Sequence, residues 1–232
     1  MDTSISVVMP AYQLGASIRD NVLRVASVLE SMPGSEIIVV DDGSADDTFS
    51  QAVSAGAARV LRHEVNLGKG AASRTGAMAA TTPTIVLLDG DLDLPPEQLP
   101  DVVDTFLQSD LDVLVGTKRY GMSGGRYPLK RRFLSGVFRI VTRVLFRLQV
   151  SETQTGLKVL RRDFAQSIMP ELEVVRYAFD LELLVRAQRL GAKIGEIPVA
   201  LRVGASSSPL SISTLWEMAR DTLRILKWSL RR

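Results

Sequence analysis

Three aspartates in the segment TIVLLDGDLDLPPEQL, residues 84–99, have the spacing of a metal site. Asp89, Asp91 and Asp93 follow an apolar run, so we expect them at the carboxyl end of a strand, where open α/β sheets bind ligands. Alternate residues of an extended segment point the same way, and a hard divalent cation relieves the repulsion among their carboxylates. The spacing therefore predicts a hard divalent cation that also contacts phosphates. The alternative is an acidic loop that caps the helix beginning near Pro96, which the position after an apolar strand disfavours.

A second acidic turn, DDGS at residues 41–44, follows the apolar run at residues 36–40 and is expected at the same edge of the sheet. One carboxylate of this turn is suited to accept the imino proton of a nucleobase. The alternative is helix capping, because Ser44 precedes Asp47 by three residues, as in a capping box.

The third loop, NLGKG at residues 66–70, leads into a segment expected to be helical. Gly68 lets the backbone approach a ligand closely, and Lys69 at a helix N-terminus is suited to meet a phosphate. The spacing matches neither a Walker loop nor a dinucleotide fingerprint, and the alternative is an ordinary glycine turn. Together, the three loops predict a site for a metal-bound nucleoside diphosphate.

The elements that position these loops follow a βαβ pattern. Apolar runs without alternation indicate parallel strands covered on both faces, expected at residues 6–9, 36–40, 59–61, 84–88 and 112–115. After residue 117 the pattern changes, and residues 156–160 form a further strand-like segment. Helices are expected between them, over residues 16–32, after residue 46, over residues 70–80 and after residue 96.

Composition excludes several classes of protein. The chain has 232 residues, 46% of them hydrophobic, which supports a real core and excludes a disordered chain. With no cysteine and a single histidine, His63, the chain has neither a thiolate nucleophile nor a cysteine or histidine metal cluster. A net charge of +2 argues against nucleic acid as a partner. Without a linker, residues 1–232 are expected to form one domain.

Two segments predict contact with a membrane surface. Residues 133–148 form an amphipathic pattern whose basic face carries Arg139, Arg143 and Arg147; the alternative is a helix packed on the core with a solvated basic face. Residues 212–232 repeat the pattern, with Trp216 and Trp228 as interface-type aromatics. No apolar stretch is long enough for a transmembrane helix, and the N-terminus does not resemble a signal peptide. We therefore expect peripheral attachment at the cytoplasmic side of the cell membrane.

The motifs, taken in order, resemble a known family. VVMPAY, EIIVVDDGS, NLGKGAA and LLDGDLDLPPEQL resemble the family 2 glycosyltransferases with the GT-A fold. GTKRYGMSGG, ETQTGLKVLRR and FDLELLVRAQRLGAKIGEIPV are similar to the branch that contains dolichyl and polyprenyl phosphate mannose synthases and related enzymes. The resemblance spans nearly the whole chain. It implies an α/β fold with a Rossmann-like, mostly parallel sheet flanked by helices, and amphipathic C-terminal helices.

The resemblance also implies roles for particular residues. Nucleoside binding falls to Pro10, Ala11, Tyr12 and Asp42, which join Gly68 and Lys69 of the glycine loop in the nucleotide site. Coordination of Mg2+ or Mn2+ falls to Asp89, Asp91 and Asp93, where Asp93 replaces a glutamine of many relatives. Contacts to the acceptor phosphate fall to Arg119, Arg131, Ser135, Gln154 and Arg202. Asp180 and Glu182 lie near the acceptor side of the pattern, either in direct contact or as support. Residues 1–117 thus form a nucleotide-sugar half, and residues 118–232 an acceptor and membrane-interface half.

The implied reaction is inverting transfer of a hexose from GDP-mannose or a UDP-sugar to polyprenyl or dolichyl phosphate. Mannose is the favoured hexose. A lipid phosphate is already an anion at neutral pH, so it attacks without a general base. Catalysis then falls to Asp91 with its metal and to Arg119 and Arg131, which draw anions together.

Two other readings stay open. One is a family 2 enzyme with a UDP-sugar donor and a glycan or other hydroxyl acceptor, although no convincing acidic base motif is found for it. The other is a nonenzymatic membrane-associated scaffold with a degenerate nucleotide fold, against which the intact acidic cluster counts. The sequence does not indicate whether a membrane-protein subunit takes part.

Overall fold

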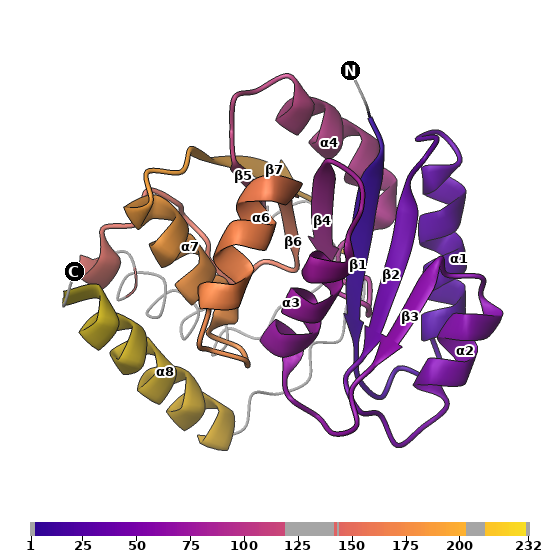
Figure 1. Cartoon of the computed structure of the whole chain (residues 1–232), viewed down its shortest axis with the longest axis horizontal. Helices are drawn as coiled ribbons and strands as arrows, with labels where there is room; N and C mark the ends of the chain where they lie inside the picture. Colours follow the sequence, from indigo (N-terminus) through magenta and orange to yellow (C-terminus); the bar gives the residue numbers. More distant parts are fainter. Residues whose placement is uncertain (1–2, 119–141, 143, 203–211, 231–232) are drawn as a thin grey trace.

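A seven-stranded sheet forms the centre of the molecule in a computed structural model that describes residues 3–118, 142, 144–202 and 212–230 (Figure 1). The strands are β1 Ile5–Ala11, β2 Glu36–Asp41, β3 Arg59–Arg62, β4 Thr84–Leu88, β5 Val113–Lys118, β6 Leu157–Arg161 and β7 Ile194–Val199. Their order across the sheet is β3-β2-β1-β4-β6-β5-β7. The six predicted strands are confirmed, and β7 is an additional strand at the sheet edge.

The sheet is mostly parallel, as predicted. Strands β1, β2, β3 and β4 pair in parallel, and so do β5 and β7, whereas β6 runs antiparallel to both β4 and β5. Because β6 is reversed, the turn at its start lies beside the carboxyl end of β4, and the Asp89 amide donates a hydrogen bond of 3.0 Å to the Gly156 carbonyl. The acidic loop after β4 is therefore joined to the TQTG turn.

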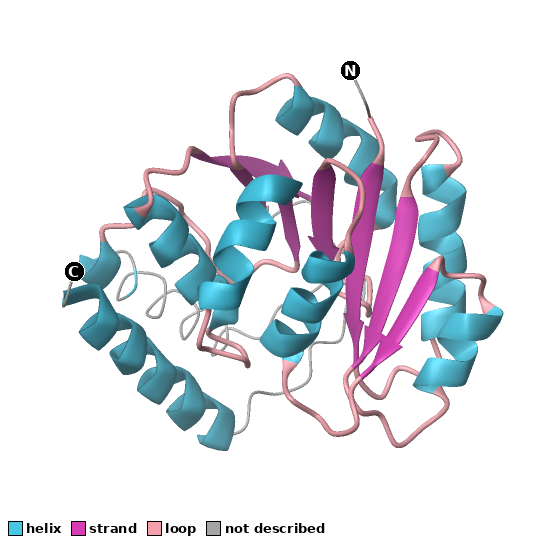
Figure 2. Cartoon of the chain, in the orientation of Figure 1, coloured by secondary structure: helices cyan, strands magenta, loops and turns pink. Residues whose placement is uncertain are grey.

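Helices cover both faces of the sheet (Figure 2). They are α1 Ile18–Leu29, α2 Thr48–Ser54, α3 Lys69–Ala79, α4 Leu99–Leu107, α6 Arg162–Ile168, α7 Phe179–Arg189 and α8 Ile212–Leu230, with short 3-10 turns η1 Pro96–Gln98 and η2 Met169–Glu171. α1, α2 and α4 pack on one face, and α3, α6 and α7 on the other. α8 lies outside α7.

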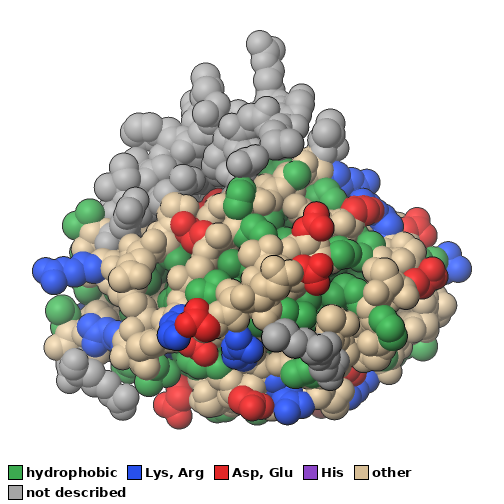
Figure 3. All heavy atoms as spheres, turned by 90° about the horizontal axis from the view of Figure 1, so that it is seen from above, with side chains coloured by type: hydrophobic (Ala, Val, Ile, Leu, Met, Phe, Trp, Pro, Cys, Tyr) green, Lys and Arg blue, Asp and Glu red, His purple; other side chains and the backbone are tan. Residues whose placement is uncertain are grey.

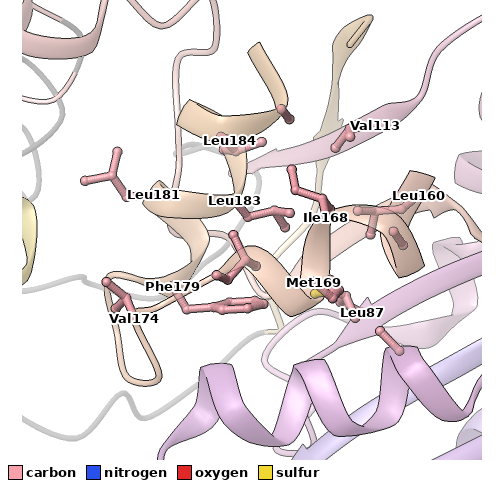
Figure 4. Close-up of a cluster of buried hydrophobic side chains, with 14 of the residues drawn as sticks. Leu87, Val113, Leu160, Ile168, Met169, Val174, Phe179, Leu181, Leu183 and Leu184 are labelled. Atoms are coloured by element: carbon pink, nitrogen blue, oxygen red, sulfur yellow. The ribbon is translucent and has the colours of Figure 1, made fainter. Parts of the chain in front are cut away.

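The alternation of side chains along each strand divides the core in two. Val7 of β1 joins the cluster under α1, α2 and α4, while Val8 joins the cluster under α3, α6 and α7. The second cluster is shown in Figure 4, where Phe179 and Leu183 of α7 lie near Ile168 and Met169. With both faces buried, the central strands need apolar residues at every position, as their sequences show.

Close packing brings the N-terminal ends of α3 and α7 together. A Cβ atom at Gly70 would collide with the Phe179 side chain, so only glycine fits at this point of α3. This contact places Lys69, the first residue of α3, next to the first turn of α7.

The amphipathic segment at residues 133–148 falls mostly outside the described residues, including Arg139 and Arg143. Its described end, residues 144–146, is helical, and Arg147 follows with a φ of +50°. The amphipathic C-terminal helix is confirmed as α8. Trp228, expected at a membrane interface, instead lies 4.1 Å from the Arg186 guanidinium and 5.6 Å from that of Arg189, so it fastens α8 to α7. Among the described helices, none has the length and apolarity needed to cross a membrane.

Candidate active site

The acidic loop after β4 turns sharply rather than continuing extended. Leu92 is fully buried and has a φ of +51°, and the Asp93 amide donates to Asp91 Oδ1 at 3.2 Å. Burial of the Leu92 side chain thus bends the chain between the acids. The expectation of an extended segment was wrong. The turn at Leu92 lies between Asp91 and Asp93, whose side chains an extended strand would have pointed the same way.

Asp91 has a pKa that its surroundings raise. The residue is exposed at the surface, yet nearby protein atoms partly desolvate its carboxylate, and the negative charges of Asp89 and Asp93 also disfavour the ionised form. Together they raise the pKa of Asp91 to about 6. A cation at this point would relieve the crowding of the charges.

The acids fit a metal that is shared with a substrate. Within the described part of the chain, no three acidic or histidine side chains are grouped as a metal cage. Mg2+ commonly takes one or two carboxylates and completes its coordination with substrate phosphates and water. Asp89 and Asp91 can supply those carboxylates, so the donor set suits a metal that arrives with a diphosphate.

Lys69 lies against these acids. Its ammonium Nζ is 2.7 Å from Asp89 Oδ1 and 3.6 Å from Asp180 Oδ2. Burial lowers the pKa of Lys69, but the charges of Asp89 and Asp180 outweigh burial and hold that pKa above its ordinary value. Lys69 therefore stays a cation at the N-terminus of α3, in the place where an anionic ligand is favoured.

Asp180 and Lys158 form a buried ion pair behind Lys69. Lys158 Nζ lies 2.8 Å from Asp180 Oδ1 and donates to the Thr155 carbonyl at 2.7 Å, and the exposed fractions of the two side chains are 1% and 8%. Burial lowers the pKa of Lys158, an effect that the Asp180 charge opposes. Burial also acts to raise the pKa of Asp180, but Lys158 and Lys69 outweigh it and lower that pKa.

The FDLE motif thus supports the site from within. Glu182, only 3% exposed, accepts hydrogen bonds from the Glu173 and Val174 amides and pairs with Arg186 at 2.7 Å. Of the two roles weighed for Asp180 and Glu182, the geometry favours support over direct contact.

The Asp42 carboxylate of the DDGS turn holds the NLGKG loop. Asp42 Oδ1 accepts the Leu67 amide at 3.0 Å and lies 2.7 Å from His63 Nδ1, while Oδ2 accepts the Gly68 amide at 2.8 Å. Asp42 is 2% exposed, so it organises the NLGKG loop, and its contact with a nucleobase stays a prediction. Asp41 Oδ2 is buried. It lies 3.2 Å from Arg62 Nε, but the orientation of the two groups does not form a hydrogen bond.

The capping alternative for this turn is not what the structure shows. Asp47 occupies the N-cap position of α2 without a side-chain capping bond. Ser44 Oγ instead accepts the Gln13 amide at 2.9 Å, and Thr48 Oγ1 accepts the Leu14 amide at 2.8 Å. The DDGS turn and the loop after β1 therefore support each other.

The residues predicted at the end of β1 differ in their exposure. Pro10 and Ala11 are buried in β1, where the Pro10 carbonyl accepts the Gly90 amide at 3.3 Å and the Ala11 carbonyl accepts the Asp42 amide at 2.8 Å. These two residues thus join the end of β1 to the acidic loop and to the DDGS turn. Tyr12 is 45% exposed, and its contact with the nucleoside stays a prediction.

The residues predicted for the acceptor are brought together only in part. The Arg202 amide donates to the Asp93 carbonyl at 2.8 Å, so Arg202 lies beside the acidic loop with an exposed side chain. Gln154 Nε2 donates to the Tyr177 carbonyl at 3.3 Å, which ties the TQTG turn to the loop before α7. Arg119, Arg131 and Ser135 lie outside the described residues.

Sequence reasoning missed Lys158. The signal for it was a lysine inside the apolar strand LKVLR, because a charge that is fully buried needs a partner. Thr155 was missed too; its Oγ1 is buried without a hydrogen-bond partner among the described residues.

Comparison with known proteins identifies the family. Residues 6–169 match the model of Glycosyl transferase family 2. The chain belongs to this family. It is 29% identical to a dolichyl-phosphate beta-glucosyltransferase of Dictyostelium discoideum, with 95% of this chain and 73% of that protein aligned. It is 26% identical to a dolichol-phosphate mannosyltransferase of Pyrococcus furiosus, with 97% of this chain aligned but only 64% of that protein, which is less than two thirds of its length.

The solved structures support the predicted GT-A fold. Glucosyl-3-phosphoglycerate synthase of Mycobacterium tuberculosis superposes with a TM-score of 0.75 at 23% identity, over 97% of this chain and 80% of that one. The fold prediction is confirmed, and this family 2 chain is a glycosyltransferase.

The buried pair behind the site generates a test of stability. Replacing Lys158 by methionine leaves Asp180 buried with its main partner removed, so we expect the free energy of unfolding to fall by about 3–5 kcal/mol. Urea denaturation measures this change. As a control, Lys193→Met breaks the surface pair with Asp110 and should leave the midpoint unchanged. Equal effects of the two substitutions would contradict the importance of the buried pair.

Proposed function

We propose that the protein transfers a hexose from a nucleoside diphosphate sugar to a polyprenyl or dolichyl phosphate, with inversion and with the help of Mg2+ or Mn2+. The observation that carries this proposal is the crowding of Asp89 and Asp91 at the carboxyl end of β4, next to Lys69. Carboxylates for a metal and an ammonium group for a diphosphate thus lie at one point of the sheet.

The donor site is supported by the loops that surround these acids. The M. tuberculosis synthase, 25% identical, has been solved with Mn2+, UDP and glucosyl-3-phosphoglycerate. In this chain Asp89 and Asp91 would hold the metal, which when bound neutralises the charge of the leaving nucleoside diphosphate. Asp93, which follows the turn at Leu92, would add its negative charge to the metal site. Lys69 would bind phosphate oxygens, and Tyr12 the nucleoside.

The acceptor is proposed from the names of the relatives and from the chemistry of the site. The Dictyostelium and Pyrococcus proteins are named for dolichyl phosphate and dolichol phosphate as their acceptors. Such a phosphate needs no proton removed before attack, so cations that position it are sufficient. Arg202 beside the acidic loop is one such cation. Gln154 in the TQTG turn, together with Arg119, Arg131 and Ser135, is expected to complete the set.

The relatives differ in the hexose for which they are named. One relative is named for glucose and the other for mannose, so both sugars are proposed as donors to test. A hydroxyl acceptor with a UDP-sugar donor remains the competing chemistry, and the choice of acceptor in the assay distinguishes the two.

The reaction is tested by transfer of radiolabelled hexose from GDP-mannose and UDP-glucose to a short polyprenyl phosphate. We expect transfer that EDTA abolishes, and Asp91→Asn to reduce it about 100-fold or more, because the metal loses a ligand. Asp104→Asn, which neutralises an exposed acid on α4, is the matched control and should keep full activity. Transfer that persists in EDTA would contradict the metal, and transfer to glycan hydroxyls alone would contradict the acceptor.

We also propose that α8 attaches the protein to the cytoplasmic membrane surface. Trp216, Leu223 and Leu230 recur every seven residues and are 73%, 56% and 77% exposed, and we call them the outer face of α8. Lys227 and Arg220 are exposed beside them, which suits anionic headgroups. Figure 1 shows α8 beginning at the end of the molecule where the carboxyl ends of β1 and β2 lie.

The described residues at the opposite end of the molecule differ in their pattern of charge. Figure 3 looks onto the end where the chain begins, and there acidic and basic side chains are interspersed over the part of the surface that is coloured. A mixture of charges gives no net attraction to an anionic surface, so the view supports assignment of the membrane contact to α8.

Cosedimentation with vesicles that contain anionic phospholipid tests this attachment. Leu223→Glu removes an apolar side chain from the outer face of α8, so we expect vesicle binding to weaken about tenfold. Val53→Glu, at a residue that is 52% exposed on α2, is the control and should bind like the unmodified protein. Equal binding by both variants would contradict a role for α8.

A further inference from the structure

We infer that Lys69 occupies the place of the metal at Asp89 in the donor-free protein. Lys69 gives up that place when a metal-bound nucleoside diphosphate enters. Asp180 then keeps the Lys69 ammonium group beside the site. This inference rests on the proposed function, because it concerns the same metal and the same diphosphate. It assigns positioning roles to Asp180 and Lys158 and makes Lys69 a competitor of the metal.

The competition follows from the contact at Asp89. Lys69 Nζ lies 2.7 Å from Asp89 Oδ1, which is the distance of a direct ion pair. A divalent cation bound to the same carboxylate would lie within a few ångströms of this ammonium group, and the two positive charges would repel each other. The metal therefore binds Asp89 well only when Lys69 moves off it or when new negative charge enters beside both cations.

Asp180 limits how far Lys69 moves. Its Oδ2 is 3.6 Å from Lys69 Nζ, a looser contact than the one to Asp89, while its Oδ1 is held at 2.8 Å by Lys158. Lys158 is itself fixed by burial and by its hydrogen bond of 2.7 Å to the Thr155 carbonyl. Asp180 is thus a rigid anionic anchor, and Lys69 can exchange Asp89 for Asp180 and a phosphate with a small rotation of its side chain.

Coupling of two ligands is the consequence. A diphosphate brings the negative charge that both the metal and Lys69 require, so it releases Asp89 to the metal at the same moment that it binds Lys69. Linkage requires the converse effect, in which the metal strengthens nucleotide binding to the same degree. The donor-free protein would then bind free metal weakly and would acquire its metal together with the nucleotide.

The inference is tested by titrating Mn2+ and following free Mn2+ by electron paramagnetic resonance, without nucleotide and with GDP or UDP. In the absence of nucleotide, Lys69→Met should bind Mn2+ about tenfold more tightly than the unmodified protein, because the competing charge is gone. Nucleotide should raise the Mn2+ affinity of the unmodified protein more than that of Lys69→Met. Lys69→Arg keeps the charge and should behave like the unmodified protein.

Controls separate this inference from the function on which it rests. Lys193→Met removes one positive charge from a surface pair with Asp110 and should leave Mn2+ binding unchanged, which excludes an effect of net charge. Equal nucleotide-free affinities of Lys69→Met and the unmodified protein would overturn the inference while leaving the metal in place. Failure of the unmodified protein to bind Mn2+ even with both nucleotides would instead overturn the metal site itself. Circular dichroism checks folding, and Lys69→Gln replaces Lys69→Met if that variant does not fold.

Discussion

An alternating row of four charges, Asp89, Lys69, Asp180 and Lys158, is the constraint on which the site depends. These side chains come from the end of β4, the start of α3, the start of α7 and the interior of β6. The buried charges of Asp180 and Lys158 are stable only when paired, which fixes β6 against α7, and the ion pairs of Lys69 join β4 and α3 to them. The same row leaves its outer member, Asp89, partly exposed at the edge of the sheet, with Asp91 two residues further along. The inner part of the row, Lys158 and Asp180, therefore stabilises the fold, while its outer member, Asp89, is available as a metal ligand.

The reversed strand β6 makes this arrangement possible. Its antiparallel course between β4 and β5 delivers Lys158 to the interior and brings Gly156 against Asp89. A Cβ atom at Gly156 would collide with the Asp89 carboxylate, so the close approach of the TQTG turn depends on glycine. On the other side, Asp42 accepts the amides of Leu67 and Gly68 and thereby fixes the loop that ends in Lys69. Backbone contacts thus hold the acids and the lysine in place from two directions.

Local patterns predicted much of this architecture, and tertiary packing decided the rest. The apolar run at residues 84–88 coincides with β4, because a strand covered on both faces needs apolar side chains throughout. β7 was missed because Pro198 and Glu196 interrupt its apolar pattern, which is tolerated at the edge of a sheet. The acids after β4 were predictable from their position, but the left-handed turn at Leu92 was not, since leucine rarely adopts that conformation. The pairing of Lys158 with Asp180 joins a strand to a helix through the core, and no local spacing encodes it.

We propose that a metal-bound nucleoside diphosphate binds at the carboxyl end of β4 between Asp89, Asp91 and Lys69. The decisive measurement is a crystal structure of the protein with Mn2+ and GDP or UDP. We expect Mn2+ coordinated by Asp89 and Asp91 and by oxygens of the diphosphate, with Lys69 moved from Asp89 to the phosphates. Mn2+ and nucleotide bound elsewhere, with the ion pair between Lys69 and Asp89 intact, would contradict it.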